Sequence, residues 1–141
     1  MNLKNKNNLY MGNYFTKKEN HKGNHVFADF VGFKGEENYL GKYIFELMIK
    51  AIERTDMKIM HRHLEILNVN TPAGFTSVLL LDSSHFTSHC YSEEGILAMD
   101  LFTCGSTNTY EVMEFVKTEL IKEFPDIKCT YLENHKRFNM I

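Results

Sequence analysis

The chain has 141 residues, of which 43% are hydrophobic and 24% charged, so it is long enough for one folded domain and short for two. Its 16 basic and 18 acidic residues lack the basic excess typical of proteins that bind nucleic acids or anionic membranes. No apolar run approaches the ~18 residues that span a bilayer, and the polar N-terminus does not resemble a secretory signal. We therefore expect a soluble cytoplasmic protein without nucleic-acid or membrane partners.

The N-terminal segment differs in composition from the rest of the chain. Residues 1–24 are rich in Asn and Lys and offer no continuous apolar face, so we expect a flexible arm there and a single domain over residues 25–141. The three cysteines, Cys90, Cys104 and Cys129, are odd in number and lack CxxC spacing. A disulfide framework or a cysteine-based zinc site is therefore not indicated.

Hydrophobic periodicity predicts six extended segments and two helices. The second helix begins at Asn108, a favourable N-cap with Glu111 three residues later, and ends before Pro125. In chain order we predict strand 25–33, helix 38–54, strands 57–69, 75–82, 84–91 and 96–103, helix 108–124 and strand 127–134. This order favours an α+β two-layer sandwich, an antiparallel sheet with both helices on one face. The other face would be bare, so we expect dimerisation to cover it.

Polar and nucleophilic side chains crowd residues 82–105, which the patterning assigns to core strands. In an extended segment 84–91, His85 and His89 project from one face and Ser84 from the other. Two kinds of chemistry can be drawn from these residue types. A metal site would use His85, His89 and Glu93, or His61 and His63, although neither set has a zincin signature. A Ser-His hydrolase would use Ser84 and His89, although no GxSxG elbow is present.

The stretch S83-S-H-F-T-S-H-C-Y-S-E-E-G95, followed by D100-L-F-T-C-G105, resembles a family motif close to E-S-H-I-S-I-H-T-W-P-E-x-G-x-x-x-x-D-x-F-T-C-G. That motif belongs to the bacterial-type S-adenosylmethionine decarboxylases, small pyruvoyl-dependent enzymes of polyamine synthesis. Upstream, P72-A-G-F-T-S77 stands in place of the family's P-Q-G-V-S-G. In element order the resemblance covers roughly residues 25 to 132.

The resemblance implies that the chain cuts itself between Ser83 and Ser84. In the family, the serine at the position of Ser84 attacks the preceding carbonyl, and elimination and hydrolysis then leave a pyruvoyl group at the new N-terminus. The products here would be residues 1–83 and 84–141. The pyruvoyl ketone forms a Schiff base with the substrate and accepts electrons as CO2 leaves, so neither PLP nor a metal is implied.

Four further residues match family positions with known roles. His89 matches the histidine that removes a proton during ester elimination, for which the near-neutral pKa of imidazole is suited. Thr76 matches a serine that supports processing, and Cys104 matches the proton donor in decarboxylation. Glu93 matches the acid that binds the substrate ribose. The resemblance further implies a homodimer of processed protomers with sites near the subunit interface.

Three departures from the motif bear on the function. Ser83 replaces the usual Glu before the cut and could itself compete as nucleophile. Asn70 and Thr71 stand where the family has the aromatic residue that stacks on adenine. The chain therefore lacks this stacking residue unless Phe75 or Tyr91 takes its place. Tyr91 and Ser92 replace Trp-Pro next to Glu93. We therefore expect a decarboxylase of S-adenosylmethionine. The same chemistry on arginine or ornithine, or a non-processed regulatory homologue, are the alternatives.

Overall fold

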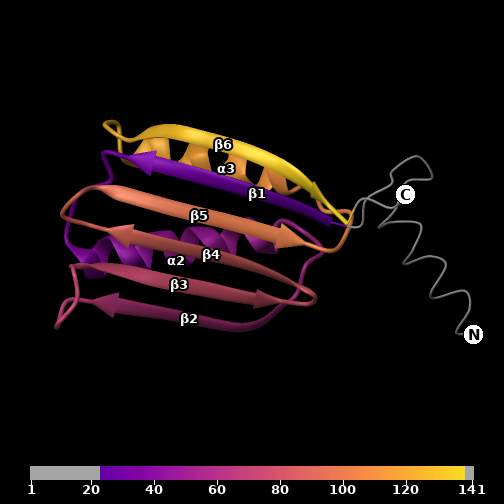
Figure 1. The fold of residues 1–141 in the computed structure, drawn as a ribbon, viewed down its shortest axis with the longest axis horizontal. Coiled ribbons are helices and arrows are strands. Elements are labelled where there is room, and N and C mark those ends of the chain that lie inside the picture. Colours follow the sequence, from indigo (N-terminus) through magenta and orange to yellow (C-terminus); the bar gives the residue numbers. More distant parts are fainter. Residues whose placement is uncertain (1–22, 139–141) are drawn as a thin grey trace, which may run out of the picture.

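Six strands form one antiparallel sheet in the structure, a computed structural model that describes residues 23–138 (Figure 1). Their order across the sheet is β2-β3-β4-β5-β1-β6. The bounds are β1 (Gly23–Val31), β2 (Ile59–Leu67), β3 (Gly74–Leu81), β4 (Ser84–Tyr91), β5 (Ile96–Thr103) and β6 (Lys128–Arg137). Strands β2 to β5 are joined by hairpins in sequence order, whereas β1 lies between β5 and β6.

Both helices lie on one face of the sheet, as predicted (Figure 1). Helix α2 (Glu37–Glu53) packs on β2, β3 and β4, and α3 (Thr109–Glu123) packs on β1, β5 and β6. The predicted cap of α3 is confirmed, because the Asn108 side chain accepts a hydrogen bond from the Glu111 N–H at 3.2 Å. Neither of these helices is both long and apolar enough to cross a membrane.

The core lies between the sheet and the helices. Alternate strand residues point toward the helices, where they meet the apolar stripes of α2 and α3. Gly41 allows α2 to approach the sheet closely, since a Cβ there would lie 2.8 Å from Ile66 Cδ1 and 3.2 Å from Phe75 Cγ. The largest fully buried side chains are Phe30, Phe33, Phe75, Phe86, Leu40, Ile44, Met48, Ile52, Leu79, Leu97, Leu101 and Met113.

The opposite face of the sheet, which we call the open face, carries no helix among the described residues. Its side chains on β4 are half-buried or exposed, whereas their neighbours along the strand are buried. The predicted α+β, two-layer architecture is therefore confirmed. Residues 1–22 of the expected arm lie outside the described residues, and Gly23 and Asn24 belong to β1, where they pair with Arg137 and Lys136.

Candidate active site

The β3–β4 hairpin carries the predicted cleavage position. Leu81 pairs with Ser84, so only Asp82 and Ser83 form the turn. Ser83 has a backbone φ of 59°, in the left-handed region that non-glycine residues seldom adopt. The peptide bond between Ser83 and Ser84 therefore lies at a tight turn, where the chain changes from exposed to buried.

Ser84 is 7% exposed and points toward the helix side of the sheet. Its Oγ donates to Thr103 Oγ1 at 3.2 Å and accepts from the Cys104 N–H at 3.4 Å. Thr103 Oγ1 also accepts from the Gly105 N–H at 3.0 Å. The structure thus brings the Cys104 backbone to Ser84 and holds the Ser84 hydroxyl between Thr103, the last residue of β5, and Cys104 directly after it.

Thr103 is a site residue that the sequence analysis did not single out. It lies in the D-x-F-T-C-G stretch, and the antiparallel register that pairs His85 with Phe102 brings it opposite Ser84. Its side chain is buried, which leaves its hydroxyl free to bond only with protein partners. The sequence feature that could have identified Thr103 is its position directly before Cys104, in a strand expected to lie next to β4.

Thr76 and His89 meet at the other end of β4, on the open face. They are register partners in β3 and β4, and Thr76 Oγ1 lies 2.7 Å from His89 Nδ1. Glu93 is exposed in the turn that follows β4. His89 is five residues from Ser84, which corresponds to about 17 Å along a strand, and the two side chains point to opposite faces. Within one chain, His89 does not reach Ser84.

For residues of a single chain, this separation excludes two readings that the sequence left open. A Ser-His hydrolase requires the two side chains within about 3 Å, which Ser84 and His89 of one chain are not. His85 and His89 share the open face, as predicted, but four residues of strand place them about 13 Å apart, too far for one metal ion. In β2, the exposed His63 is paired with Glu65 at 2.8 Å.

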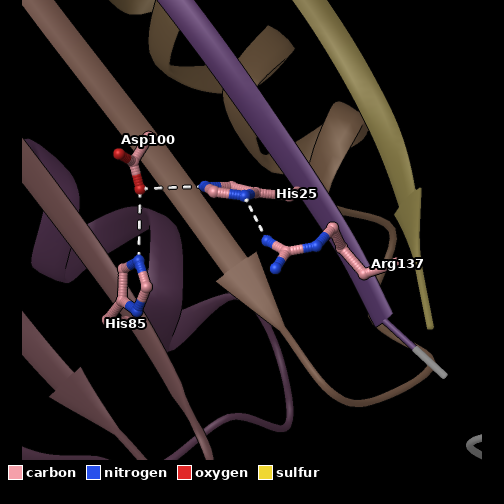
Figure 2. A network of polar contacts seen from close by, with 4 residues as sticks. All are labelled: His25, His85, Asp100 and Arg137. Carbon is pink, nitrogen blue, oxygen red and sulfur yellow. Dashed lines mark hydrogen bonds and ion pairs between the residues drawn. The ribbon is translucent and has the colours of Figure 1, made fainter.

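A polar cluster that the sequence did not predict joins four strands on the open face (Figure 2). Asp100 Oδ1 lies 3.1 Å from His25 Nε2 and 3.2 Å from His85 Nε2. Arg137 Nη1 lies 3.0 Å from His25 Nδ1. The four side chains come from β1, β4, β5 and β6, so no local sequence pattern links them.

The cluster contains a set of atoms that could ligate a metal, yet its hydrogen bonds argue against that use. A guanidinium only donates hydrogen bonds, so His25 Nδ1 must accept from Arg137. Neutral His25 then carries its proton on Nε2 and donates it to Asp100. A metal ion needs the lone pair of that same nitrogen. The arrangement therefore fits a hydrogen-bonded cluster in which Asp100 orients both imidazoles.

A cavity of about 420 Å³ opens beside the cleavage position. It is bounded by open-face side chains such as Leu80, His85 and Phe102, and by Ser83 and Ser84 at the hairpin. Although the Ser84 side chain points toward the helices, this cavity links the start of β4 with the open face. A group on the open face can therefore approach the backbone at residues 83 and 84.

The three cysteines are free thiols in different surroundings. Cys90 is 3% exposed on the helix side of β4, and burial raises its pKa to about 12. Burial also raises the pKa of the partly buried Cys129 thiol. Cys104 is half-buried and adjoins the Ser84 hydroxyl through its own backbone. Cys104 is the cysteine whose backbone contacts Ser84, whereas Cys90 belongs to the core.

The chain is similar to known proteins along most of its length. A family model described as S-adenosylmethionine decarboxylase matches residues 24–130. The S-adenosylmethionine decarboxylase proenzyme of Clostridium botulinum (strain Langeland) is 27% identical over 107 residues, which are 75% of this chain and 90% of that protein. The proenzyme of Sulfurihydrogenibium sp. is 30% identical over 95 residues, 67% of this chain and 69% of that protein.

A solved structure shares the fold. The crystal structure of the adenosylmethionine decarboxylase from Aquifex aeolicus has a TM-score of 0.62 and 25% identity, covering 83% of this chain and 91% of that one. The family match includes both ends of the site, from Thr76 and His89 to Ser84 and Cys104. The chain belongs to the S-adenosylmethionine decarboxylase family.

Proposed function

We propose that this protein is a self-processing, pyruvoyl-dependent decarboxylase of S-adenosylmethionine that supplies the aminopropyl donor for spermidine synthesis. The observation that carries the proposal is Ser84 at a strained hairpin, with its hydroxyl held beside Cys104. Relatives named proenzymes, which match most of the chain, support the same reading. A cytoplasmic location stays a prediction.

Self-cleavage needs only atoms of the chain and one water. Ser84 Oγ bonds to the carbonyl carbon of Ser83, the C–N bond breaks, and the hydroxyl proton moves to the nitrogen, so the amide becomes an ester. Removal of the Cα proton of residue 84 then breaks the Cβ–O bond, frees the Ser83 carboxylate and leaves an enamine, which becomes an imine as a proton moves from its nitrogen to Cβ. Water hydrolyses the remaining imine to a ketone and ammonia. Thr103, which accepts from Ser84 Oγ, orients this hydroxyl in the uncut chain.

The residues at the start of β4 fit the pyruvoyl group that this cleavage would leave. The group supplies a conjugated carbonyl that accepts the electron pair released with CO2. Cys104, directly after β5, would donate a proton, because a thiol in a partly buried site acts as a general acid. The cavity beside Ser84 offers the space for the substrate. The proposal involves neither PLP nor a metal.

His89 enters this scheme from a second subunit. In one chain His89 lies about 17 Å along β4 from Ser84 and on the opposite face. A second copy packed on the open face, with its β4 antiparallel to the first, would bring its own His89 over the start of β4, where the cavity opens toward the backbone of residues 83 and 84. A two-fold axis across the strands produces that arrangement and forms two equivalent sites. We therefore propose a homodimer in which the partner's His89 acts at Ser84.

The first experiment is an intact-mass time course of freshly purified protein, with Ser84→Ala as control. Two fragments divided between residues 83 and 84, the second starting with pyruvoyl and both absent from the control, are the expected result. A full-length chain that persists on long incubation would instead identify a non-processed regulatory homologue. Release of labelled CO2 from carboxyl-labelled S-adenosylmethionine by the cut protein then tests the substrate.

Mixed dimers test the position of His89. Ser84→Ala cannot cut itself but retains His89, whereas His89→Ala retains Ser84. When the two chains are coexpressed with tags of different mass, we expect the His89→Ala chain to be cut only in the mixture. Cleavage of His89→Ala alone at the wild-type rate would refute a role for this histidine. Failure of the mixture, with dimers present, would refute its supply by the partner.

The substrate-binding region lacks the family's aromatic residue at position 70. This departure favours arginine or ornithine as an alternative substrate class. Asn70 stands at the position of the family's stacking residue with a φ of 57°, and its side chain has no ring to stack on adenine. Phe75 is 1% exposed and is likewise unavailable. Tyr91 is 47% exposed and lies on the open face beside His89. We propose that the partner's Tyr91, next to the partner's His89, stacks on adenine.

Replacing this tyrosine discriminates between the substrates. Tyr91→Ala is expected to raise the KM for S-adenosylmethionine by about 5-fold to 150-fold, since base stacking contributes about 1–3 kcal/mol. Tyr91→Phe keeps the ring and should keep the KM. If the processed enzyme decarboxylates arginine or ornithine in preference to S-adenosylmethionine, the adenine-binding role of Tyr91 is refuted and the alternative substrate class is established.

A further inference from the structure

We propose that the left-handed backbone conformation of Ser83 is strain that the fold imposes on the uncut chain and that self-cleavage releases. This inference rests on the proposed cleavage between Ser83 and Ser84. Ser83 has a φ of 59°, and a residue with a Cβ is disfavoured there because the Cβ approaches a carbonyl oxygen. The strained residue is the one whose carbonyl carbon would be attacked.

The surrounding contacts prevent this turn from relaxing in the uncut chain. On one side, the Asp82 N–H donates to the Lys58 carbonyl at 3.1 Å, and Leu81 pairs with Ser84 in the hairpin register. On the other side, the buried Ser84 hydroxyl is bonded to Thr103 and to the Cys104 N–H. Because both ends are fixed and the turn has only two residues, residue 83 must absorb the reversal of the chain.

Among the described residues, Asn70 and Phe138 also have a positive φ without being glycine, whereas two turns next to strands of the sheet use glycine. Gly95, between β4 and β5, has a φ of 71°, and Gly32, after β1, has a φ of 79°. Glycine adopts these values without a steric penalty. The hairpin at the cleavage position instead has serine, so here the sequence retains a penalty that a single substitution to glycine would remove.

The ester formed in the first step of cleavage allows the strain to be released. In the amide, the carbonyl carbon of Ser83 connects to Cα of residue 84 through one atom, the nitrogen. In the ester the connection runs through Oγ and Cβ, so it is one atom longer, and its Oγ–Cβ and Cβ–Cα bonds are rotatable single bonds. Ser83 can then return to a negative φ. The strain raises the free energy of the amide relative to the ester and so increases the population that proceeds to elimination.

Three variants at residue 83 test the inference in a time course of cleavage. Ser83→Gly removes the penalty, so we expect cleavage to slow by about fivefold, which corresponds to about 1 kcal/mol at 1.36 kcal/mol per tenfold. Ser83→Ala removes the hydroxyl and keeps the Cβ, so it should cleave within about twofold of wild type. Ser83→Asn should be intermediate, because asparagine tolerates this conformation better than serine.

The same strain must appear as lost stability when cleavage is blocked. In a Ser84→Ala background, Ser83→Gly should raise the equilibrium constant for folding by about fivefold, the factor by which it slows cleavage. Asn70→Gly is the matched control, because Asn70 has a φ of 57° in a turn away from the cut. It should stabilise the protein without slowing cleavage. A merely structural role for Ser83 would change stability and leave the cleavage rate unchanged.

The outcomes separate this inference from the proposed function. An uncut wild-type protein overturns the self-cleavage itself and the inference with it. A wild type that is cut, together with a Ser83→Gly variant cut at the same rate, overturns only the role of strain. A loss of rate in Ser83→Ala as large as in Ser83→Gly also overturns it, because the hydroxyl and not the backbone would then be responsible.

Discussion

Replacing Thr103 by valine tests whether the Ser84 hydroxyl must be held in place for cleavage. The substitution keeps the branched shape but removes the acceptor that lies 3.2 Å from Ser84 Oγ and 3.0 Å from the Gly105 nitrogen. One neutral hydrogen bond contributes about 0.5–1.5 kcal/mol, and a buried donor left unpaired costs about 1–3 kcal/mol. We expect cleavage about tenfold slower than wild type, which corresponds to about 1.4 kcal/mol.

Intact-mass time courses measure the cleavage rate, and urea unfolding in a Ser84→Ala background measures stability without interference from the cut. In that background only the bond to Gly105 is lost, so the free energy of unfolding should fall by about 1–3 kcal/mol. Thr109→Val is the matched control: Thr109 is fully buried, and its hydroxyl donates to Asn134 Oδ1 at 2.7 Å, away from Ser84. Equal cleavage rates for the two variants would refute the role of Thr103.

Three further predictions concern packing, pH and protonation. Gly74→Ala should lower the free energy of unfolding, measured by urea titration, by more than about 3 kcal/mol, because the new Cβ would lie 1.9 Å from the Cys90 carbonyl oxygen. Gly35→Ala is the control and should have little effect, because its Cβ meets only the flexible end of a leucine at 3.1 Å. The Cys90 thiol has its folded pKa raised to about 12 from an ordinary value of 9.0, so its contribution to stability is complete below pH 9 and is lost as pH rises toward 12. The free energy of unfolding should fall between pH 9 and pH 12 by up to about 1.4 kcal/mol per pH unit. If a Cys90→Ala variant shows the same decrease with pH, the decrease does not come from the Cys90 thiol. In 15N spectra of histidine-labelled Ser84→Ala protein, His25 should carry its proton on Nε2, and Arg137→Met should remove that preference; a proton on Nδ1 in the unmodified cluster would contradict the hydrogen bonding inferred from Figure 2.

The sequence was sufficient for the elements because each has a strong local signal. The cap at Asn108 and the alternation of β3 and β4 depend only on neighbouring residues, and both were predicted within one or two positions. Strand β6 extends to Arg137, three residues beyond the predicted end. Its last residues are polar and pair with β1, so register with a distant strand determines them and no local pattern does.

The candidate site divides in the same way. Ser84, His89 and Cys104 lie in one motif, which the sequence analysis recognised as a unit. The separation of Ser84 from His89 follows from strand rise and the alternation of faces, so it could have been calculated from the predicted strand. The cluster around Asp100 could not be predicted from the sequence, because its members come from four strands whose order in the sheet is not evident from the sequence.

The place of β1 in the sheet determines what a cut after Ser83 would do to the molecule. The first 83 residues contain β1 to β3 and α2, and the remainder contains β4, β5, α3 and β6. Strand β1 lies between β5 and β6, and β3 pairs with β4, so the first fragment meets the second along three ladders.

The two pieces therefore cannot separate without dismantling the sheet, and a cut protein would behave as a two-chain complex whose assembly is the same event as its folding. The unfolding midpoint of the cut protein should depend on protein concentration more strongly than the midpoint of the uncut chain does.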